Sequence, residues 1–136
     1  MRVFLDSSVM LSACGSGKSL SRLITEIAPE RGWRLISASY CRAETSRNIG
    51  KLGANANLKW PELQTKIEWV SNAHTSKKPL LLTASKDKPV LISALAAKSD
   101  VLLTLDKGDF GLLLGTTVYG MRVSTPRDFL LAADLG

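Results

Sequence analysis

Five acidic residues stand at positions where their carboxylates could do chemistry. They are Asp6, Glu44, Asp87, Asp106 and Asp109. Five bare carboxylates cannot share a small volume, because like charges repel and some of the acids would stay protonated. A cation among them removes this repulsion, and hard divalent ions such as Mg²⁺ and Mn²⁺ take oxygen ligands of this kind. If the fold gathers these acids, the sequence predicts a magnesium or manganese site.

Two of the five acids are hard to explain as structural residues. Asp6 directly follows the apolar run 2–5, and Asp106 directly follows the apolar run 101–105. Both runs are typical of short buried strands. In a parallel sheet the active site lies beyond the carboxyl ends of the strands, so these two carboxylates are expected at one edge of the sheet.

The other three acids each have a structural alternative. Asp87 precedes the apolar segment 89–97 and could be a helix N-cap. Asp109 could be a turn residue in the loop after Asp106. Glu44 lies at the edge of a helical apolar stripe, where a solvated charge is common, but this position can also face a cleft. These alternatives stay open until the fold is known.

Short apolar runs alternate with helical segments along the chain. The expected strands are residues 2–5, 33–37, 80–83, 101–105 and 118–123. The expected helices are residues 9–14, 18–28, 39–52, 58–71, 88–98 and a last one opened by Pro126. This alternation predicts an α/β domain of three layers with a mainly parallel, five-stranded sheet. A length of 136 residues fits one domain, residues 1–136.

The charge balance suits a protein that binds a polyanion. The chain has 18 Lys and Arg against 12 Asp and Glu, a formal net charge of +6. Without the five acids above, the other seven acids oppose 18 basic residues, which leaves the rest of the chain at +11. A basic body can hold phosphates while an acidic pocket holds the metal that cuts them. Arg42, Arg47 and Lys107 are the basic residues expected nearest the site.

Other kinds of site find little support. Cys14 and Cys41 lack CxxC spacing and are expected to be reduced, partly buried thiols, and the single His74 has no partner at zinc-ligand spacing. The opening apolar run stops at Asp6, which is too short for a signal peptide or a membrane span, so a cytoplasmic location is the default expectation.

Two further motifs invite other functions. Residues 15–19, Gly-Ser-Gly-Lys-Ser, resemble part of a phosphate-binding P-loop, but Ser12 stands where the full motif needs glycine. A flexible turn before the next helix is the competing interpretation. Phosphoacceptor domains also place an acid after a strand, yet they need a second acid close by, and Asp6-Ser7-Ser8 has none.

The ordered set of motifs resembles the PIN-domain family over essentially the whole chain. The matching pieces are the opening Val3 to Val9 with Asp6-Ser7-Ser8, Ala43-Glu44-Thr45, Asp87 before Pro89-Val90-Leu91, Leu103 to Phe110 with Asp106 and Asp109, and the tail Ser124 to Leu130. No single piece is specific, whereas the ordered set is. The tail is similar to that of a subfamily of toxins from bacterial toxin–antitoxin pairs.

The resemblance implies a Rossmann-like sheet ordered 3-2-1-4-5 and Mg²⁺- or Mn²⁺-dependent cleavage of single-stranded RNA. Asp6, Glu44, Asp87 and Asp106 match the family's acidic quartet, and Asp109 matches its frequent fifth acid. Thr104 matches a small polar position that helps to hold the site. Ser7-Ser8 replaces the Thr-Asn of many members, and the Ser8 hydroxyl still supplies a hydrogen-bond donor.

Partners also follow from the resemblance. A cognate antitoxin protein and a homodimer are expected, and no membrane. The alternative to a ribonuclease is a non-catalytic PIN module that binds RNA or a partner protein.

Overall fold

Strands and helices alternate along the chain in the computed structural model, which describes residues 1–72 and 88–133. In chain order the elements are β1 (Arg2–Leu5), α1 (Ser7–Gly15), α2 (Leu20–Arg31), β2 (Arg34–Ala38), α3 (Ser39–Asn48), the 3₁₀ helix η1 (Ile49–Leu52), α4 (Ala54–Gln64), β3 (Glu68–Val70), α5 (Lys88–Ala96), β4 (Val101–Leu103), α6 (Lys107–Phe110), β5 (Thr117–Val118), β6 (Met121–Ser124) and α7 (Pro126–Ala132).

These strands form one sheet in the order β3-β2-β1-β4-β6-β5. Neighbours pair in parallel, except that β5 and β6 are antiparallel. The α/β class and the order 3-2-1-4-5 are thus confirmed, with β6 in the fifth place. Within the described residues the sheet has six strands rather than the five expected, because β5 adds an edge strand.

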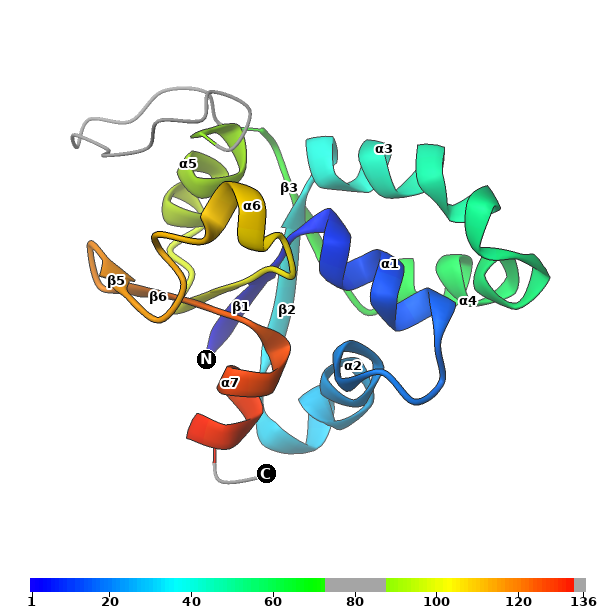
Figure 1. Ribbon diagram of the computed structural model, residues 1–136, viewed down its shortest axis with the longest axis horizontal. Helices are drawn as coiled ribbons and strands as arrows, with labels where there is room; N and C mark the ends of the chain where they lie inside the picture. Colours follow the sequence, from blue (N-terminus) through cyan, green and yellow to red (C-terminus); the bar gives the residue numbers. More distant parts are fainter. Residues whose placement is uncertain (73–87, 134–136) are drawn as a thin grey trace.

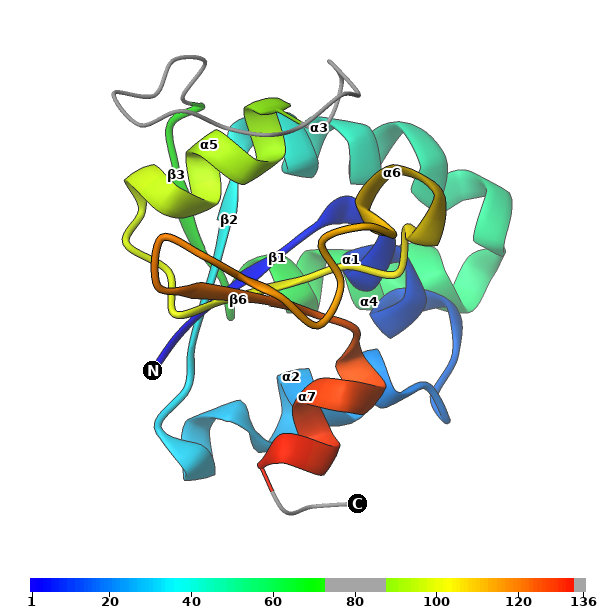
Figure 2. The ribbon, with the colours of Figure 1, turned by 60° about the vertical axis from the view of Figure 1, so that its left-hand side comes forward.

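Helices cover both faces of the sheet (Figures 1 and 2). From β1 to β2 to β3 the chain steps in one direction, and right-handed crossovers put the helices α1 to α4 on one face. The chain then returns to β4 on the other side of β1, which puts α5 and α6 on the opposite face. The order of strands therefore reverses between β1 and β4, at the centre of the sheet.

The two central strands are buried on both faces, as expected for parallel strands between helical layers. Val3, Phe4 and Leu5 of β1 are fully buried, and so are Leu102 and Leu103 of β4. Burying each such side chain stabilises the fold by roughly 1.5–3 kcal/mol. This apolar centre fixes β1 against β4 and thereby fixes the strand end that Asp6 follows and the start of the loop that leads from β4 to Asp106.

The predicted helix 58–71 is wrong in its second half. Helix α4 runs from Ala54 to Gln64, and residues 68–70 form β3, which pairs with β2. The segment Glu68-Trp69-Val70 combines an aromatic and a β-branched residue, and pairing along β2 outweighs the helical spacing of its apolar side chains. The predicted strand 80–83 lies outside the described residues. At the edge of the sheet beside β2, where the expected order puts the third strand, lies β3.

The predicted strand 118–123 is a hairpin of β5 and β6. Tyr119 and Gly120 separate the two strands, with φ of 49° and 86°. Left-handed backbone at both central residues is what a tight two-residue hairpin turn requires. Gly120 adopts this conformation without strain, because it has no Cβ.

Helix boundaries elsewhere follow local capping. Asp6 caps α1, which therefore begins at Ser7 rather than at residue 9. Gly32 ends α2 with a φ of 69°, so the helix runs through Pro29 and past the expected end at residue 28. Gly53 follows η1 with a φ of 95°, where the sequence predicts the end of the helix from residue 39. Among the described residues, no helix has the length and apolar character needed to cross a bilayer.

Both cysteines are free and buried, as the sequence predicts. Burial raises the pKa of the Cys14 thiol to about 11. For Cys41, burial and the nearby charge of Asp6 raise the pKa to about 12. Thiolates, which are the reactive form, are therefore scarce at pH 8.

We expect an aromatic disulfide reagent at pH 8 to label the native protein very slowly and to label both cysteines once the protein is unfolded in guanidinium. Absorbance of the released thiolate measures both rates. One equivalent released rapidly from the native protein would show that one of these thiols is not protected by the fold.

Candidate active site

The candidate site lies where the strand order reverses, between the carboxyl ends of β1 and β4. Chains leaving two such strands go to opposite faces, which opens a crevice at this point of an α/β sheet. Four of the five predicted acids line one cavity of about 340 Å³ there; they are Asp6, Glu44, Asp106 and Asp109. The fifth, Asp87, lies outside the described residues.

Asp6 is the most buried of these acids, with 6% of its surface exposed. Its Oδ1 accepts the backbone N–H of Ser7 at 2.8 Å, which caps α1. Its Oδ2 accepts the hydroxyl of Thr104 at 2.8 Å and that of Ser8 at 3.1 Å. Burial raises the pKa of Asp6; the hydrogen bonds from Thr104, Ser8 and Ser7 oppose this shift, and the charge of Glu44 adds to it.

The loop after β4 orients the two hydroxyls toward Asp6. The N–H of Leu105 donates to Ser8 Oγ at 3.0 Å, and the N–H of Asp106 donates to Thr104 Oγ1 at 3.1 Å. Each oxygen thus accepts from the backbone, and its own hydrogen can point to the Asp6 carboxylate. The sequence places Ser8 and Thr104 in a supporting role, and both contact Asp6.

Glu44 reaches the same cavity from α3. Its Oε1 accepts a hydrogen bond from the Ser7 hydroxyl. The side chain of Asn48 donates to the Glu44 carbonyl oxygen at 2.8 Å. Burial raises the pKa of the Tyr40 phenol, and the charge of Glu44 raises it further. Glu44 is therefore a cavity residue and not a solvated surface charge.

Ser7, Tyr40 and Asn48 line the cavity, and the sequence analysis does not assign them to the site. Tyr40 and Asn48 stand four residues before and after Glu44. Residues at this spacing share one face of a helix, so the pattern could have identified both. The contact of Ser7 with Glu44 joins α1 to α3 and has no local signal in the sequence.

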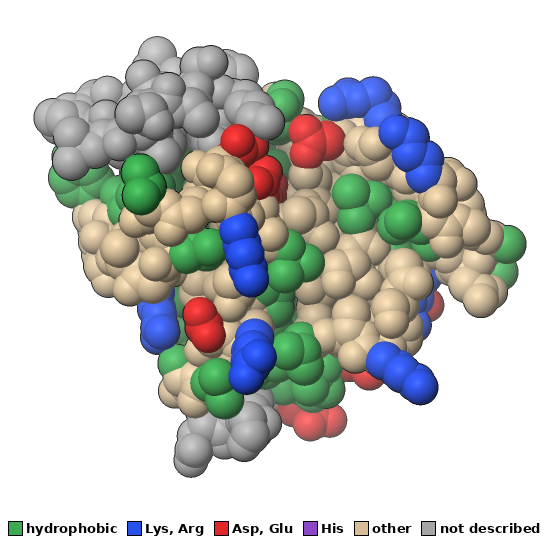
Figure 3. Space-filling model, in the orientation of Figure 1, with side chains coloured by type: hydrophobic (Ala, Val, Ile, Leu, Met, Phe, Trp, Pro, Cys, Tyr) green, Lys and Arg blue, Asp and Glu red, His purple; other side chains and the backbone are tan. Residues whose placement is uncertain are grey.

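Asp106 and Asp109 form the other wall of the cavity. Asp106 caps α6, and its Oδ1 accepts the N–H of Asp109 at 2.9 Å. Both residues are half-buried. In Figure 3 acidic side chains gather between α6 and the start of α3, and basic side chains lie to either side of them. The region of the cavity is thus marked by acidic side chains, while other acidic and basic side chains are scattered over the rest of this face.

The donor set of the cavity has the chemistry of a Mg²⁺ or Mn²⁺ site, because its charged groups are carboxylates. However, the described parts of the chain, 1–72 and 88–133, bring no three acidic, histidine or cysteine side chains together closely enough to hold a metal ion. Asp6 and Glu44 instead face hydroxyl donors. The residues of the cavity therefore fit a hard cation by type, and Asp87 of the predicted quartet lies outside the part of the chain that was searched.

The Gly-Ser-Gly-Lys-Ser segment is not arranged as a P-loop. It follows helix α1 rather than a strand, and the Ser16 N–H donates to the Ser12 carbonyl at 3.3 Å. The Ser19 hydroxyl accepts the N–H of Arg22 at 3.1 Å and so caps α2. The segment is a turn between two helices, which is the competing interpretation above.

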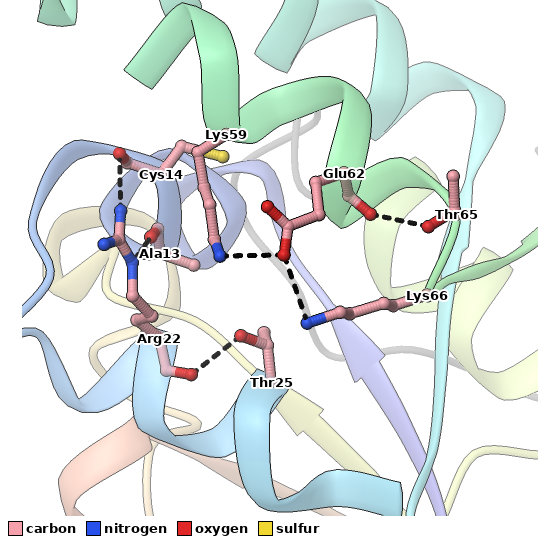
Figure 4. A network of polar contacts seen from close by, with 8 residues as sticks. All are labelled: Ala13, Cys14, Arg22, Thr25, Lys59, Glu62, Thr65 and Lys66. Carbon is pink, nitrogen blue, oxygen red and sulfur yellow. Dashed lines mark hydrogen bonds and ion pairs between the residues drawn. The ribbon is translucent and has the colours of Figure 1, made fainter. Parts of the chain in front are cut away.

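The guanidinium of Arg22 lies at the carboxyl end of α1 (Figure 4). Its guanidinium donates to the carbonyl oxygens of Ala13 at 2.6 Å and Cys14 at 2.9 Å. Nearby, Glu62 pairs with Lys59 at 3.1 Å and with Lys66 at 3.8 Å. The bonds of Arg22 tie α2 to α1, whereas the ion pairs of Glu62 lie within α4 and the turn after it.

The three basic residues expected near the site differ in their surroundings. Arg42 lies over the Trp69 ring, 4.9 Å from its centre, and donates to Gln64 at 2.8 Å, so it is engaged with α4 and β3. Arg47 and Lys107 are exposed. Lys107 lines a groove beside the cavity together with Arg127 of α7.

Comparison with known proteins supports the fold. The chain is similar to one chain in the crystal structure of VapBC2 from Rickettsia felis bound to a DNA fragment from their promoter. The TM-score is 0.64 at 13% sequence identity, and the match covers 92% of this chain and 98% of that chain. No protein-family model matches the sequence, and no curated protein matches it. At this identity the similarity shows a shared fold.

Asp6→Asn tests whether this carboxylate is kept at a cost to stability. Asparagine retains the acceptor for the Ser7 N–H, and the hydroxyls of Ser8 and Thr104 can accept from its amide group. It also removes a buried charge whose ionised form the fold disfavours. In EDTA at pH 7 we expect the variant to melt no lower than wild type by circular dichroism. A melting temperature several degrees lower would identify Asp6 as a structural residue.

The same pair of proteins should differ in pH dependence. Because the pKa of Asp6 is raised above its ordinary 3.8, the folded state binds a proton at a pH where the unfolded chain has lost it. The contribution of Asp6 to the free energy of unfolding therefore rises as pH falls from neutral through the folded-state pKa, and it levels off below 3.8.

As the pH is lowered from 7 toward 4, the free energy of unfolding of wild type should therefore increase relative to that of Asp6→Asn. Urea titrations at several pH values measure this difference. Hydrogen bonds from Lys59 and Arg34 lower the pKa values of Glu62 and Glu68, so protonation of these two acids destabilises the fold at low pH. Both proteins carry these residues, so this effect cancels in the comparison. If wild type gained no stability relative to Asp6→Asn as the pH fell, the raised pKa of Asp6 would be contradicted.

Proposed function

We propose that this protein is a metal-dependent endoribonuclease that cleaves single-stranded RNA. The observation that carries the proposal is the convergence of four predicted acids on one cavity at the reversal of strand order. These acids come from segments up to 103 residues apart, from Asp6 to Asp109. A capping or turn role can account for each of Asp6, Asp106 and Asp109 separately. Such roles do not account for the presence of all three in one cavity with Glu44.

In this proposal Asp6, Glu44, Asp87 and Asp106 hold Mg²⁺ or Mn²⁺, and Asp109 is a further ligand or supports one. The bound ion would lower the pKa of a water molecule and neutralise the scissile phosphate. Asp6 is held by Ser8 and Thr104, so its carboxylate is oriented before any ion or substrate arrives. Exposed Lys107 and Arg47 would attract the RNA backbone toward an otherwise repulsive acidic cavity.

The toxin of a toxin–antitoxin pair is the biological setting that we propose. It is supported by the shared fold with a chain of a VapBC2 structure and by the resemblance of the C-terminal tail to toxins. The natural partner would then be an antitoxin protein that neutralises the enzyme. Co-expression with the gene next to its own, followed by purification of a complex, tests this setting apart from the chemistry.

A non-catalytic binding module is the second candidate. The observation that favours it is that the carboxylates of Asp6 and Glu44 face hydroxyl donors, with no three-ligand cluster in the described residues. Such a module would bind RNA or a partner without needing a divalent ion. Metal-dependent cleavage discriminates between the two candidates.

Purified protein should cleave labelled single-stranded RNA in Mn²⁺ or Mg²⁺ and stop when EDTA is added. Ca²⁺ should largely fail to restore cleavage, because its larger and looser coordination positions water poorly. Asp6→Asn should lower the rate by orders of magnitude, whereas Asp128→Asn removes the same charge from exposed α7 and should leave the rate unchanged. Full activity in EDTA, or an active Asp6→Asn protein, would reject this mechanism.

RNA binding should weaken as salt rises. The Asp6→Asn protein is used so that the RNA is not cleaved. The logarithm of its association constant for RNA should fall linearly with the logarithm of the salt concentration, with a slope of about −0.7 per phosphate contacted. Fluorescence anisotropy with a labelled oligonucleotide measures the slope. If the affinity were insensitive to salt, the net charge of +6 would have no role in holding RNA.

A further inference from the structure

Ser7 contacts two of the predicted acids at once. It is the first residue of α1 and is buried, with 4% of its surface exposed. Its backbone N–H donates to Asp6 Oδ1 at 2.8 Å, and its hydroxyl donates to Glu44 Oε1. One residue therefore links a carboxylate at the end of β1 to a carboxylate on α3.

Glu44 needs such a link more than Asp6 does. Asp6 follows directly from β1, and sheet pairing continues to it, since its N–H donates to the Leu103 carbonyl at 3.0 Å. Glu44 has a longer side chain on α3, which begins after Ala38 and lacks a side-chain cap. The negative charge of Asp6 also repels it, so an unheld Glu44 side chain would turn toward solvent.

We infer that Ser7 is a positioning residue whose hydroxyl holds Glu44 inside the cavity, beside Asp6, where both carboxylates can face one divalent cation. The inference rests on the proposed function. A carboxylate offers about four acceptor positions, and Ser7 uses one of them on Oε1. The Tyr40 phenol also hydrogen-bonds to this carboxylate. The positions that Ser7 and Tyr40 leave stay available to a cation, so the hydroxyl and the cation can share Glu44.

Mn²⁺ binding in the absence of RNA tests the inference directly. Isothermal titration compares wild type with Ser7→Ala, Ser7→Thr and Ser12→Ala. We expect Ser7→Ala to weaken Mn²⁺ binding at least 10-fold, as is typical when a residue that orients a ligand is removed. Ser7→Thr keeps the hydroxyl and should recover most of the affinity. Ser12→Ala is a matched control, because Ser12 lies on the same helix but lines a different groove. This variant should bind Mn²⁺ like wild type.

Two results would overturn the inference. Unchanged Mn²⁺ affinity in Ser7→Ala would show that Glu44 needs no tether, and tighter binding would show that the hydroxyl competes with the cation. In cleavage assays the Mn²⁺ concentration for half-maximal rate should rise in Ser7→Ala while KM for RNA stays near that of wild type. A general loss of structure would raise KM and lower the melting temperature in EDTA instead.

A metal-free measurement separates this inference from the proposed function. Urea unfolding of wild type, Ser7→Ala, Glu44→Ala and the double variant in EDTA forms a double-mutant cycle. A contact between the two side chains predicts effects that do not add, and additive effects would refute the contact. If wild type bound no Mn²⁺, the proposed function and the cation role of Ser7 would both fail, while a non-additive cycle would still establish the tether.

Discussion

The burial of one carboxylate, that of Asp6, constrains the centre of this structure. An ionised acid removed from water is unstable unless donors replace the lost solvent. Here the donors come from three places: the N–H that starts α1, a hydroxyl in the first turn of that helix, and Thr104 beyond β4. The register of β1 on β4, which aligns Leu5 with Leu103, brings Thr104 beside Asp6 across 98 residues of sequence. Sheet register, helix start and loop conformation therefore all meet at this acid.

These donors do not fully compensate the lost solvent, since the pKa of Asp6 stays above its ordinary value. The fold tolerates this because its stability comes from elsewhere, from the apolar strands on which the acid stands. A buried carboxyl group with a raised pKa, placed where the central strands end, favours a functional role over a stabilising one. The nearby Glu44 strengthens the point, because a structural site would not bring a second acid toward the first.

Sequence reasoning succeeded where one local pattern decides the outcome. Asp6 and Asp106 each end an apolar run, so their place at the sheet edge follows from the parallel topology alone. It failed where two patterns overlap: Val70 continues the helical spacing of Leu63 and Ile67 yet pairs with β2, and Tyr119-Gly120 turns within an apolar run. The bond from Ser7 to Glu44 is a third case. It depends on how α1 packs against α3, and no spacing along the chain encodes that.

The cavity thus has a rigid part and an adjustable part. Asp6 continues the pairing of β1 with β4, so a shift of this residue would break sheet register, whereas Asp106 follows β4 after two further residues and caps α6. Glu44 stands on α3, which is joined to the sheet by packing and to Asp6 through the Ser7 hydroxyl. A cation entering such a cavity would meet the fixed carboxylate of Asp6 and, on α3, a carboxylate able to move toward it. Glu44 is therefore the described acid of the cavity that can move most easily toward a cation, and the hydroxyl of Ser7 sets the position from which that movement begins.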